Sequence, residues 1–428
     1  MKETRNFWLY AAGRLVSLIG SGVQDVAIPL FILDLTGSGT MMGTFMIITV
    51  APRLVLVPIA GVIGDRMNRK VIMVWMDFGR GAVILGLAML AAQGLVTVPV
   101  LFAAQLGVSL MNALFGPATA AMLPDIVEEE DLTRANSIRG SIDSFSYIVG
   151  PILGGVLYGF GGIQTVFLIN GISFVGSGAS EFFIRYEQKT RKLGKVKEVF
   201  YDLKEGFTFV RTQRGLLILL LFALLLNFLV NPLFSVLFPY VMRVVIQFSA
   251  EQYGMLQTSF VTGILIGNII IGALLAKAKV ETMFIKGLLV QSALMFLFVG
   301  LIFPQVVEAL GYASWTFFSV LFCTFVMMGV FNAFVNTPMA VEIQKLAPTE
   351  FRARVFSVLE VASQGIIPIG FGIMGILIDV ISPHIVALIV MVIEGSIVLL
   401  FVFKYSKDVF REFNNRNNQT RAAYDGAE

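Results

Sequence analysis

Long hydrophobic runs, separated by short polar segments, follow one another along almost the whole chain. About 20 apolar residues are enough for a helix to cross the hydrocarbon core of a bilayer. The pattern therefore predicts an all-α membrane protein with twelve transmembrane helices, near residues 7–33, 41–63, 71–92, 98–122, 137–160, 164–186, 215–242, 252–276, 283–304, 312–340, 355–380 and 383–404.

Basic residues between the runs fall almost entirely on one side of the predicted membrane. Lys2, Arg134, Lys345 and the basic segment 185–214 share that side, whereas Arg243 alone falls on the other. Lys and Arg collect in the cytoplasmic loops of membrane proteins. Both termini are therefore predicted to be cytoplasmic.

Composition agrees with this interpretation and narrows the function. The chain is 57% hydrophobic and only 14% charged, against about 25% charged residues in soluble domains. Its net charge of +3 is explained by the cytoplasmic loops, so no nucleic-acid partner is expected. One cysteine, Cys323, and one histidine, His384, leave little material for a metal site, a cofactor site or a catalytic triad. An enzyme is accordingly disfavoured, and a receptor lacks the usual attached signalling domain.

An internal duplication organises the predicted helices. Asn112 and Gly150 recur at Asn332 and Gly370, both at an offset of 220 residues. Repeats of this kind are common in transporters, whose substrate site lies at the repeat interface. The predicted divisions are a first six-helix bundle, a cytoplasmic linker with an amphipathic helix, a second six-helix bundle and a disordered cytoplasmic tail, at 1–186, 187–214, 215–404 and 405–428.

Two equivalent helices carry polar stripes. Charged residues at the bilayer centre cost at least ~2.5–3.5 kcal/mol, so they face the interior of a bundle or a wet cavity. Hydrogen bonds between helices, worth ~0.6 kcal/mol each, are the simpler alternative. We expect the stripes to line a shared substrate cavity. They comprise Arg14, Ser17, Ser21 and Asp25 in the first helix and, 210 residues later, Asn227, Asn231 and Ser235.

Further polar residues inside the spans extend this expected cavity. Gln105, Ser109 and Asn112 are spaced i, i+4 and i+7 on the fourth helix, and Asn332 is the counterpart of Asn112. Arg53 lies near the middle of the second helix, within reach of an ion pair with Asp25. A few polar groups in an apolar cavity suit an amphipathic substrate.

Carboxylates within the spans are candidates for proton coupling. Burial favours their protonated form, so Asp25, Asp143, Glu360 and Glu394 are predicted to load and release protons. Asp143 is expected to pair with Arg139 at i−4 on the same helix.

Two other charged positions are expected to be structural. Asp77 is expected to pair with Arg80 at i+3 on the third helix. Glu181 is expected to be solvated near the cytoplasmic end of the sixth.

The segment "GVIGDRMNRK" follows the second span. It resembles the pattern G-x-x-x-D-R-x-G-R-R/K of the major facilitator superfamily, with Asn68 in place of the second glycine. The resemblance implies the major facilitator fold and a cytoplasmic gating motif, in which an acid ending the fourth helix takes part. The matching residues are Gly61, Asp65, Arg66, Arg69, Lys70 and, for that acid, Asp125.

A second segment, "GPILGG", is similar to the core of the motif associated with antiporters in that superfamily. Its matching residues are Gly150, Pro151, Gly154 and Gly155. The alternative is that the proline kink and the small residues beside it serve only the close packing of helices. The segments "SYIVGP" and "RARVFSVLEVAS" resemble the drug-efflux branch that includes macrolide exporters.

These resemblances imply a secondary transporter that exports amphipathic small molecules in exchange for protons. It would act as a monomer in the bacterial cytoplasmic membrane, with the lipid bilayer, the substrate and protons as its partners. The alternative is an exporter or flippase of an endogenous compound such as a lysolipid, siderophore or metabolite.

Overall fold

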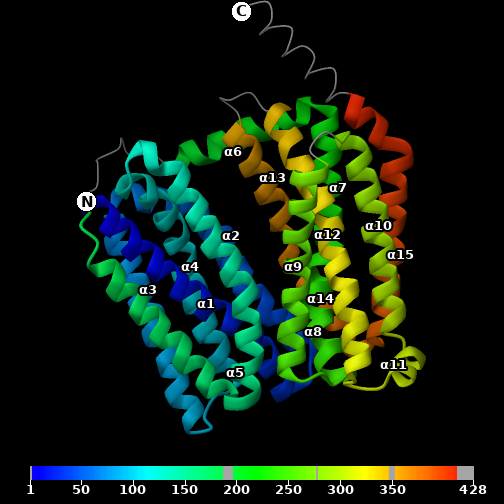
Figure 1. The fold of residues 1–428 in the computed structure, drawn as a ribbon, viewed down its shortest axis with the longest axis horizontal. Helices are drawn as coiled ribbons and strands as arrows, with labels where there is room; N and C mark the ends of the chain where they lie inside the picture. The colour runs from blue at the N-terminus through cyan, green and yellow to red at the C-terminus, as the bar shows by residue number, and fades with distance from the viewer. Residues whose placement is uncertain (1, 187–195, 276–277, 347–351, 412–428) are drawn as a thin grey trace, which may run out of the picture. The chain divides into compact units, whose positions relative to one another are not determined.

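A computed structural model of the chain describes residues 2–186, 196–275, 278–346 and 352–411. In those ranges the secondary structure is helical (Figure 1). The helices are α1 (Lys2–Thr36), α2 (Gly39–Arg66), α3 (Arg69–Ala92), α4 (Val98–Ile126), α5 (Leu132–Phe182), α6 (Val196–Thr212), α7 (Arg214–Pro232), α8 (Phe238–Tyr240), α9 (Ala250–Leu274), α10 (Val280–Leu301), α11 (Pro304–Leu310), α12 (Trp315–Leu346), α13 (Arg352–Gly365), α14 (Ile367–Val380) and α15 (Pro383–Leu400). Short 3₁₀ or π-helical turns lie at Glu129–Asp131, Leu233–Leu237, Val241–Val245 and Phe401–Tyr405.

Eleven helical segments within the described ranges are long and apolar enough to cross a membrane. One of them, Glu129–Phe182, is 54 residues long and contains the span predicted at 137–160 and most of the span predicted at 164–186. Gly162 interrupts it with a φ of 62°, which is a left-handed conformation that suits glycine. The prediction of a multi-pass helical membrane protein is confirmed, whereas the count of twelve crossings stays a prediction.

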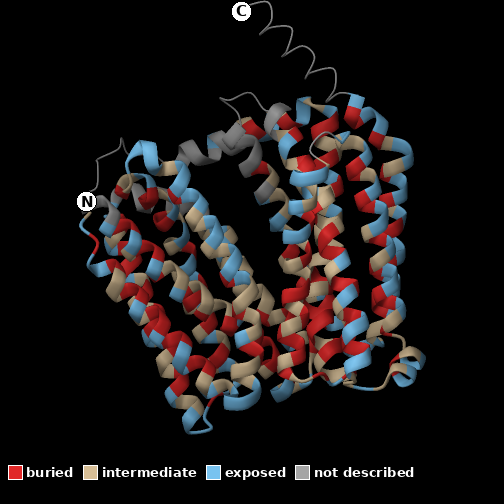
Figure 2. Cartoon of the chain, in the orientation of Figure 1, coloured by how far each residue is buried: buried red, intermediate tan, exposed pale blue. Residues whose placement is uncertain are grey.

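The chain divides into two compact units. The first unit comprises residues 1–198 and 242–258, and the second comprises residues 199–241 and 259–428. Figure 2 shows that buried positions alternate with exposed ones along the helices of each unit. Many exposed positions carry large apolar side chains, such as Trp75, Phe160 and Phe403. Such a surface suits contact with lipid rather than water.

Glycines bring α1 and α5 of the first unit into close contact. A Cβ atom at Gly150 would lie 2.9 Å from the Cα of Gly22, and one at Gly154 would lie 2.7 Å from the carbonyl oxygen of Val23. A Cβ atom at Gly155 would come still closer to the carbonyl oxygen of Ala250. Small residues are the usual means of close helix approach in membranes. The "GPILGG" segment therefore has a packing role in this unit.

Aromatic packing builds much of the second unit. Phe325 contacts the ring of Phe238 at a centroid distance of 4.9 Å and that of Phe298 at 5.4 Å. In the same unit, the ring of Phe222 stacks on that of Phe401 at a centroid distance of 4.2 Å. These rings supply the core that holds α7, α10, α12 and the last helix together.

The C-terminal helix extends beyond the predicted start of a disordered tail at residue 405. Helical structure continues through Arg411, and Val409 and Phe410 are buried in the core of the second unit. The linker residues 196–212 form α6, where a helix was predicted, and Val210 at its end is buried. Residues 187–195 and 412–428 lie outside the described part of the chain.

Candidate functional site

An ion pair links α1 and α5 inside the first unit. Arg14 Nε lies 2.7 Å from Asp143 Oδ1, and the second guanidinium contact, to Oδ2, is 2.8 Å long. The two side chains are 16% and 27% exposed, so the pair is partly accessible. Two parallel hydrogen bonds of this kind fix both the geometry and the orientation of the partners.

The expected pairing of Asp143 with Arg139 is wrong. The prediction used spacing along one helix, where residues at i and i+4 are neighbours. The glycine contacts bring α1 against α5, and Arg14 reaches Asp143 across that contact with both carboxylate oxygens engaged.

The expected ion pair between Asp25 and Arg53 is also absent. Both side chains are exposed, and Asp25 makes no hydrogen bond or ion pair with the described residues. Ser21 is half-buried, but Ser17 is buried. The polar stripe of α1 thus begins in the α1–α5 contact at Arg14 and ends on an accessible surface at Asp25.

The polar residues predicted on α4 lie in different environments. Gln105 is buried and donates to the hydroxyl of Thr49 on α2 at 3.1 Å, and Ser109 is buried beside it. Asn112 is exposed, and its side-chain oxygen accepts a hydrogen bond from Arg80. Asn112 therefore keeps an accessible surface in this structure, whereas Gln105 and Ser109 are enclosed by neighbouring helices.

The polar residues predicted in the second unit are half-buried. The amide of Asn231 donates to Asn227 at 2.7 Å, and the amide of Asn336 donates to Asn332 at 2.9 Å. Ser235 lies in the π-helical turn that follows α7. Each stripe therefore satisfies part of its hydrogen bonding along its own helix.

Of the other predicted coupling residues, Glu394 is buried. The hydroxyl of Ser292 on α10 donates to Glu394 on α15 at 2.8 Å, which places this carboxyl between two helices of the second unit. The side chain of Glu360 lies outside the described part of the structure.

At one end of the first unit, Asp125 joins α3, α4 and the segment after α5. Arg69 contacts Asp125 at 2.6 Å, and the hydroxyl of Tyr186 donates to the same carboxylate at 2.9 Å. Burial and this hydrogen bond raise the pKa of Tyr186 to about 12. Asp125 thus contacts the "GVIGDRMNRK" segment through Arg69, and its part in gating stays a prediction.

The asparagine that replaces the motif's second glycine caps α3. The side-chain oxygen of Asn68 accepts from the backbone amides of Lys70 and Val71 at 3.0 and 3.4 Å, which is a favourable N-cap arrangement. Lys70 lies over the ring of Phe182 at 5.3 Å. Gly61, Asp65 and Arg66 belong to α2, but their side chains lie outside the described part of the structure.

Replacing Tyr186 by phenylalanine should lower the free energy of unfolding by about 0.5–1.5 kcal/mol, because one hydrogen bond to Asp125 is lost. The raised pKa means that the neutral hydroxyl is stabilised by folding. Its contribution is complete below about pH 10, the unfolded value, and is lost as pH rises toward 12.

Thermal unfolding of the wild type and Tyr186→Phe between about pH 6 and 9 should therefore give a constant difference in Tm. Tyr201→Phe, an exposed tyrosine on α6, is the control. A difference that disappeared already near pH 7 would contradict this assignment.

A second polar cluster lies where α1 ends and was not predicted. Asp34 accepts two hydrogen bonds from Arg243, at 2.7 and 2.9 Å, and one from the hydroxyl of Tyr158 at 2.7 Å. Arg243 also donates to the carbonyl oxygen of Phe248 at 3.0 Å. The signal in the sequence was the isolation of Arg243 on its side of the predicted membrane.

The remaining charged residues inside the first unit are on α3 and α5. Asp77 and Arg80 pair as expected from their spacing. Glu181 on α5 is 2% exposed, so the expectation that it is solvated is wrong. Its position close to the end of α5 did not reveal that α1 and α3 cover it.

Comparisons with known proteins identify the family of the chain. The sequence matches the family model of the Major Facilitator Superfamily over residues 10–303 and 220–422. It is 26% identical over 375 residues to macrolide efflux protein A of Streptococcus pyogenes, covering 85% of this chain and 87% of that protein. The protein of the same name from Enterococcus faecalis is 26% identical over 345 residues, covering 77% of this chain and 100% of that protein.

The fold agrees with these sequence relationships. The crystal structure of a bacterial homologue of the iron transporter ferroportin, in its inward-facing state, superposes with a TM-score of 0.71 at 18% identity. The match covers 94% of this chain and 99% of that one. The helical membrane fold and the extent of the family match lead to one conclusion: the chain belongs to the Major Facilitator Superfamily of transporters.

Proposed function

We propose that this transporter exports amphipathic small molecules in exchange for protons. The observation that carries the proposal is the Arg14–Asp143 ion pair, a partly accessible charge pair between two long membrane helices. Two relatives over most of the chain are named as macrolide efflux proteins, which supports large amphipathic molecules as the substrate class.

The ion pair supplies a simple coupling element. A proton that binds to Asp143 neutralises the carboxylate, so Arg14 keeps its positive charge and loses its ionic partner. Breaking one side of a partly buried pair is strongly unfavourable unless the remaining charge finds a new partner. Protonation of Asp143 therefore changes which side-chain arrangement at the α1–α5 contact is favoured, and so how this helix pair packs against its other neighbours, as a proton-driven transport cycle requires.

In this proposal the protein works as a monomer in the bacterial cytoplasmic membrane, with both termini in the cytoplasm. Substrate and proton bind alternately from the two sides of the membrane, near Asn112 and the polar stripe of α1 that ends at Asp25. The accessible surfaces of Asp25 and Asn112 support that placement.

The test uses purified protein in liposomes with a radiolabelled macrolide on the side from which it is exported. We expect an imposed proton gradient to increase substrate flux at least tenfold over the rate without a gradient. A protonophore should remove that increase. Liposomes without protein, and liposomes with an imposed electrical potential alone, are the controls.

Two outcomes separate the alternatives. Flux that is unchanged by a protonophore would contradict proton exchange. Gradient-driven flux of a lysolipid in the absence of macrolide flux would keep the mechanism but replace the substrate class with an endogenous lipid.

A further inference from the structure

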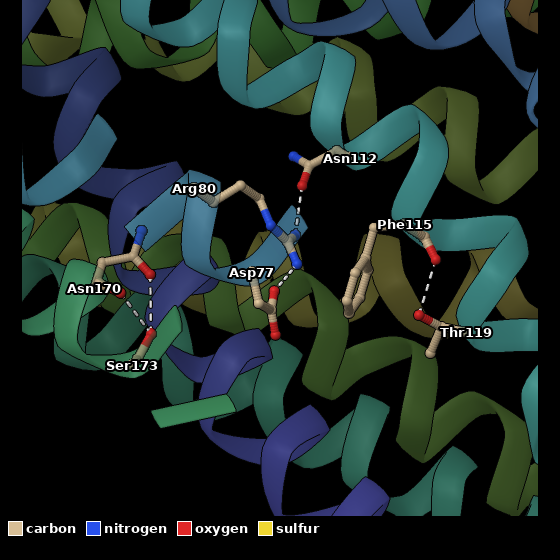
Figure 3. A network of polar contacts seen from close by, with 7 residues as sticks. All are labelled: Asp77, Arg80, Asn112, Phe115, Thr119, Asn170 and Ser173. Atoms are coloured by element: carbon tan, nitrogen blue, oxygen red, sulfur yellow. Dashed lines mark hydrogen bonds and ion pairs between the residues drawn. The ribbon is translucent and has the colours of Figure 1, made fainter. Parts of the chain in front are cut away.

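Three acidic or basic side chains are buried together between α3 and α5. Asp77, Arg80 and Glu181 are 0%, 4% and 2% exposed. Arg80 pairs with Asp77 and donates to the side-chain oxygen of Asn112 on α4 at 2.6 Å. Figure 3 shows Arg80 between Asp77 and Asn112, beside the ring of Phe115.

Aromatic rings enclose the guanidinium of Arg80. Its central carbon lies 4.0 Å from the ring centroid of Phe115 and 4.5 Å from that of Phe174. Contacts of this kind stabilise a cation that has lost its water. Arg80 is therefore held firmly on the side of Asp77, Asn112 and the two rings.

The charges of this cluster do not balance. Arginine stays protonated in proteins, so Arg80 neutralises one carboxylate, while Asp77 and Glu181 supply two. Glu181 is within electrostatic range of both Asp77 and Arg80. A second ionised carboxylate in this dry position would be very unfavourable.

A polar atom of the cluster lacks a partner. Within the described part of the chain, Glu181 Oε2 is buried without a hydrogen-bond partner, whereas the hydroxyl of Ser177 lies close enough to Asp77 to donate to it. A proton on one of two coupled carboxyl groups lowers the charge and supplies a donor. The described residues contain no group of three or more metal-ligating side chains, and Arg80 repels a bound cation.

Tyr10 connects this cluster with the proposed coupling pair. Its hydroxyl is buried on α1, is without a hydrogen-bond partner among the described residues, and lies within electrostatic range of Glu181, Arg14 and Asp143. Tyr10 and Arg14 are four residues apart on the same helix and therefore share a face. Tyr10 is thus within electrostatic range of both the buried Glu181 and the partly accessible Asp143.

We propose that Asp77 and Glu181 together bind one proton, as a second proton site of the first unit beside Asp143. One of the two carboxyl groups holds the proton, so the cluster carries no net charge when it is bound. Its release to Asp143 leaves a second carboxylate, which at Glu181 is within electrostatic range of Arg80 and Tyr10. The role in transport rests on the proposed proton exchange, whereas the bound proton itself does not.

The first test detects the proton directly. Infrared spectra of the purified full-length protein in lipid nanodiscs at neutral pH should contain a protonated-carboxyl band that Glu181→Gln reduces. Glu129→Gln, an exposed carboxyl before α5, should leave that band unchanged. A band that is identical in the wild type and Glu181→Gln would overturn the proposal.

The second test measures coupling in liposomes that contain a pH-sensitive dye. We expect Glu181→Gln to reduce substrate-driven proton movement at least tenfold while substrate exchange without a gradient continues. A purely structural Glu181 would reduce both activities together. Asp77→Asn provides a second variant, with the same expected loss of the infrared band.

The two readouts separate this proposal from the proposed function. If wild-type flux ignores the proton gradient but the band disappears in Glu181→Gln, proton exchange is wrong and the buried proton site stands. If flux follows the gradient and neither variant alters the band, the buried site is wrong and proton exchange stands.

Discussion

Replacing Asp143 by asparagine should reduce proton-driven substrate flux at least tenfold while leaving the substrate Kd within about threefold. Asparagine keeps the size of the side chain and one hydrogen bond to Arg14, but it cannot bind and release a proton near neutral pH. Flux in liposomes with an imposed proton gradient, together with binding measured by isothermal titration, checks both parts.

Two further variants serve as controls for this prediction. Asp131→Asn removes an exposed carboxylate just before α5 and should leave flux and binding unchanged. The exchange of both partners, Arg14→Asp with Asp143→Arg, should restore the folded state better than either single change, because the pair is reformed. If gradient-driven flux through Asp143→Asn equals that of the wild type, Asp143 has no part in the coupling mechanism.

Replacing Gly154 by leucine should abolish the folded protein. A Cβ atom there would lie 2.7 Å from the carbonyl oxygen of Val23 and 3.0 Å from its Cα atom, so α1 and α5 must separate. Both contacts are with backbone, which cannot move aside as the end of a side chain can. We expect the monodisperse peak in size-exclusion chromatography to be lost and the remaining protein to aggregate.

Gly140 on the same helix is the matched control. Nothing lies within 4 Å of a Cβ atom at that position, and a larger residue has a better helix propensity than glycine by up to about 1 kcal/mol. Gly140→Leu should therefore keep its chromatographic peak and its Tm, or raise the latter slightly. Equal behaviour of the two variants would show that close packing at Gly154 is unimportant.

The helices could be predicted from the sequence because each span must satisfy its backbone hydrogen bonds within itself. The bilayer imposes that condition locally, so hydropathy alone locates most helices. The Asp77–Arg80 pair was likewise predictable, since both residues lie on one helix at a spacing of three. The helical end of the chain, to Arg411, was missed because the packing of Val409 and Phe410 depends on distant partners.

The site could be predicted only in part, for the same physical reason. Asp143 was chosen because a carboxylate within a span is rare, but its partner comes from α1, 129 residues away. The Asp34–Arg243 pair joins residues 209 positions apart. Spacing along one helix contains no information about such contacts. The burial of Glu181 likewise depends on how neighbouring helices cover it.

The glycine contacts between α1 and α5 restrict how the Arg14–Asp143 pair can respond to a proton. Where two backbones touch, as at Gly22 and Gly150, no side chain can yield to let the helices slide or turn against each other. The pair therefore cannot be opened by drawing its two helices apart. A change in charge therefore has to act through rotation of the two side chains. The helices α1 and α5 move together as one rigid body, and the surfaces that slide during transport are those between this pair and other helices.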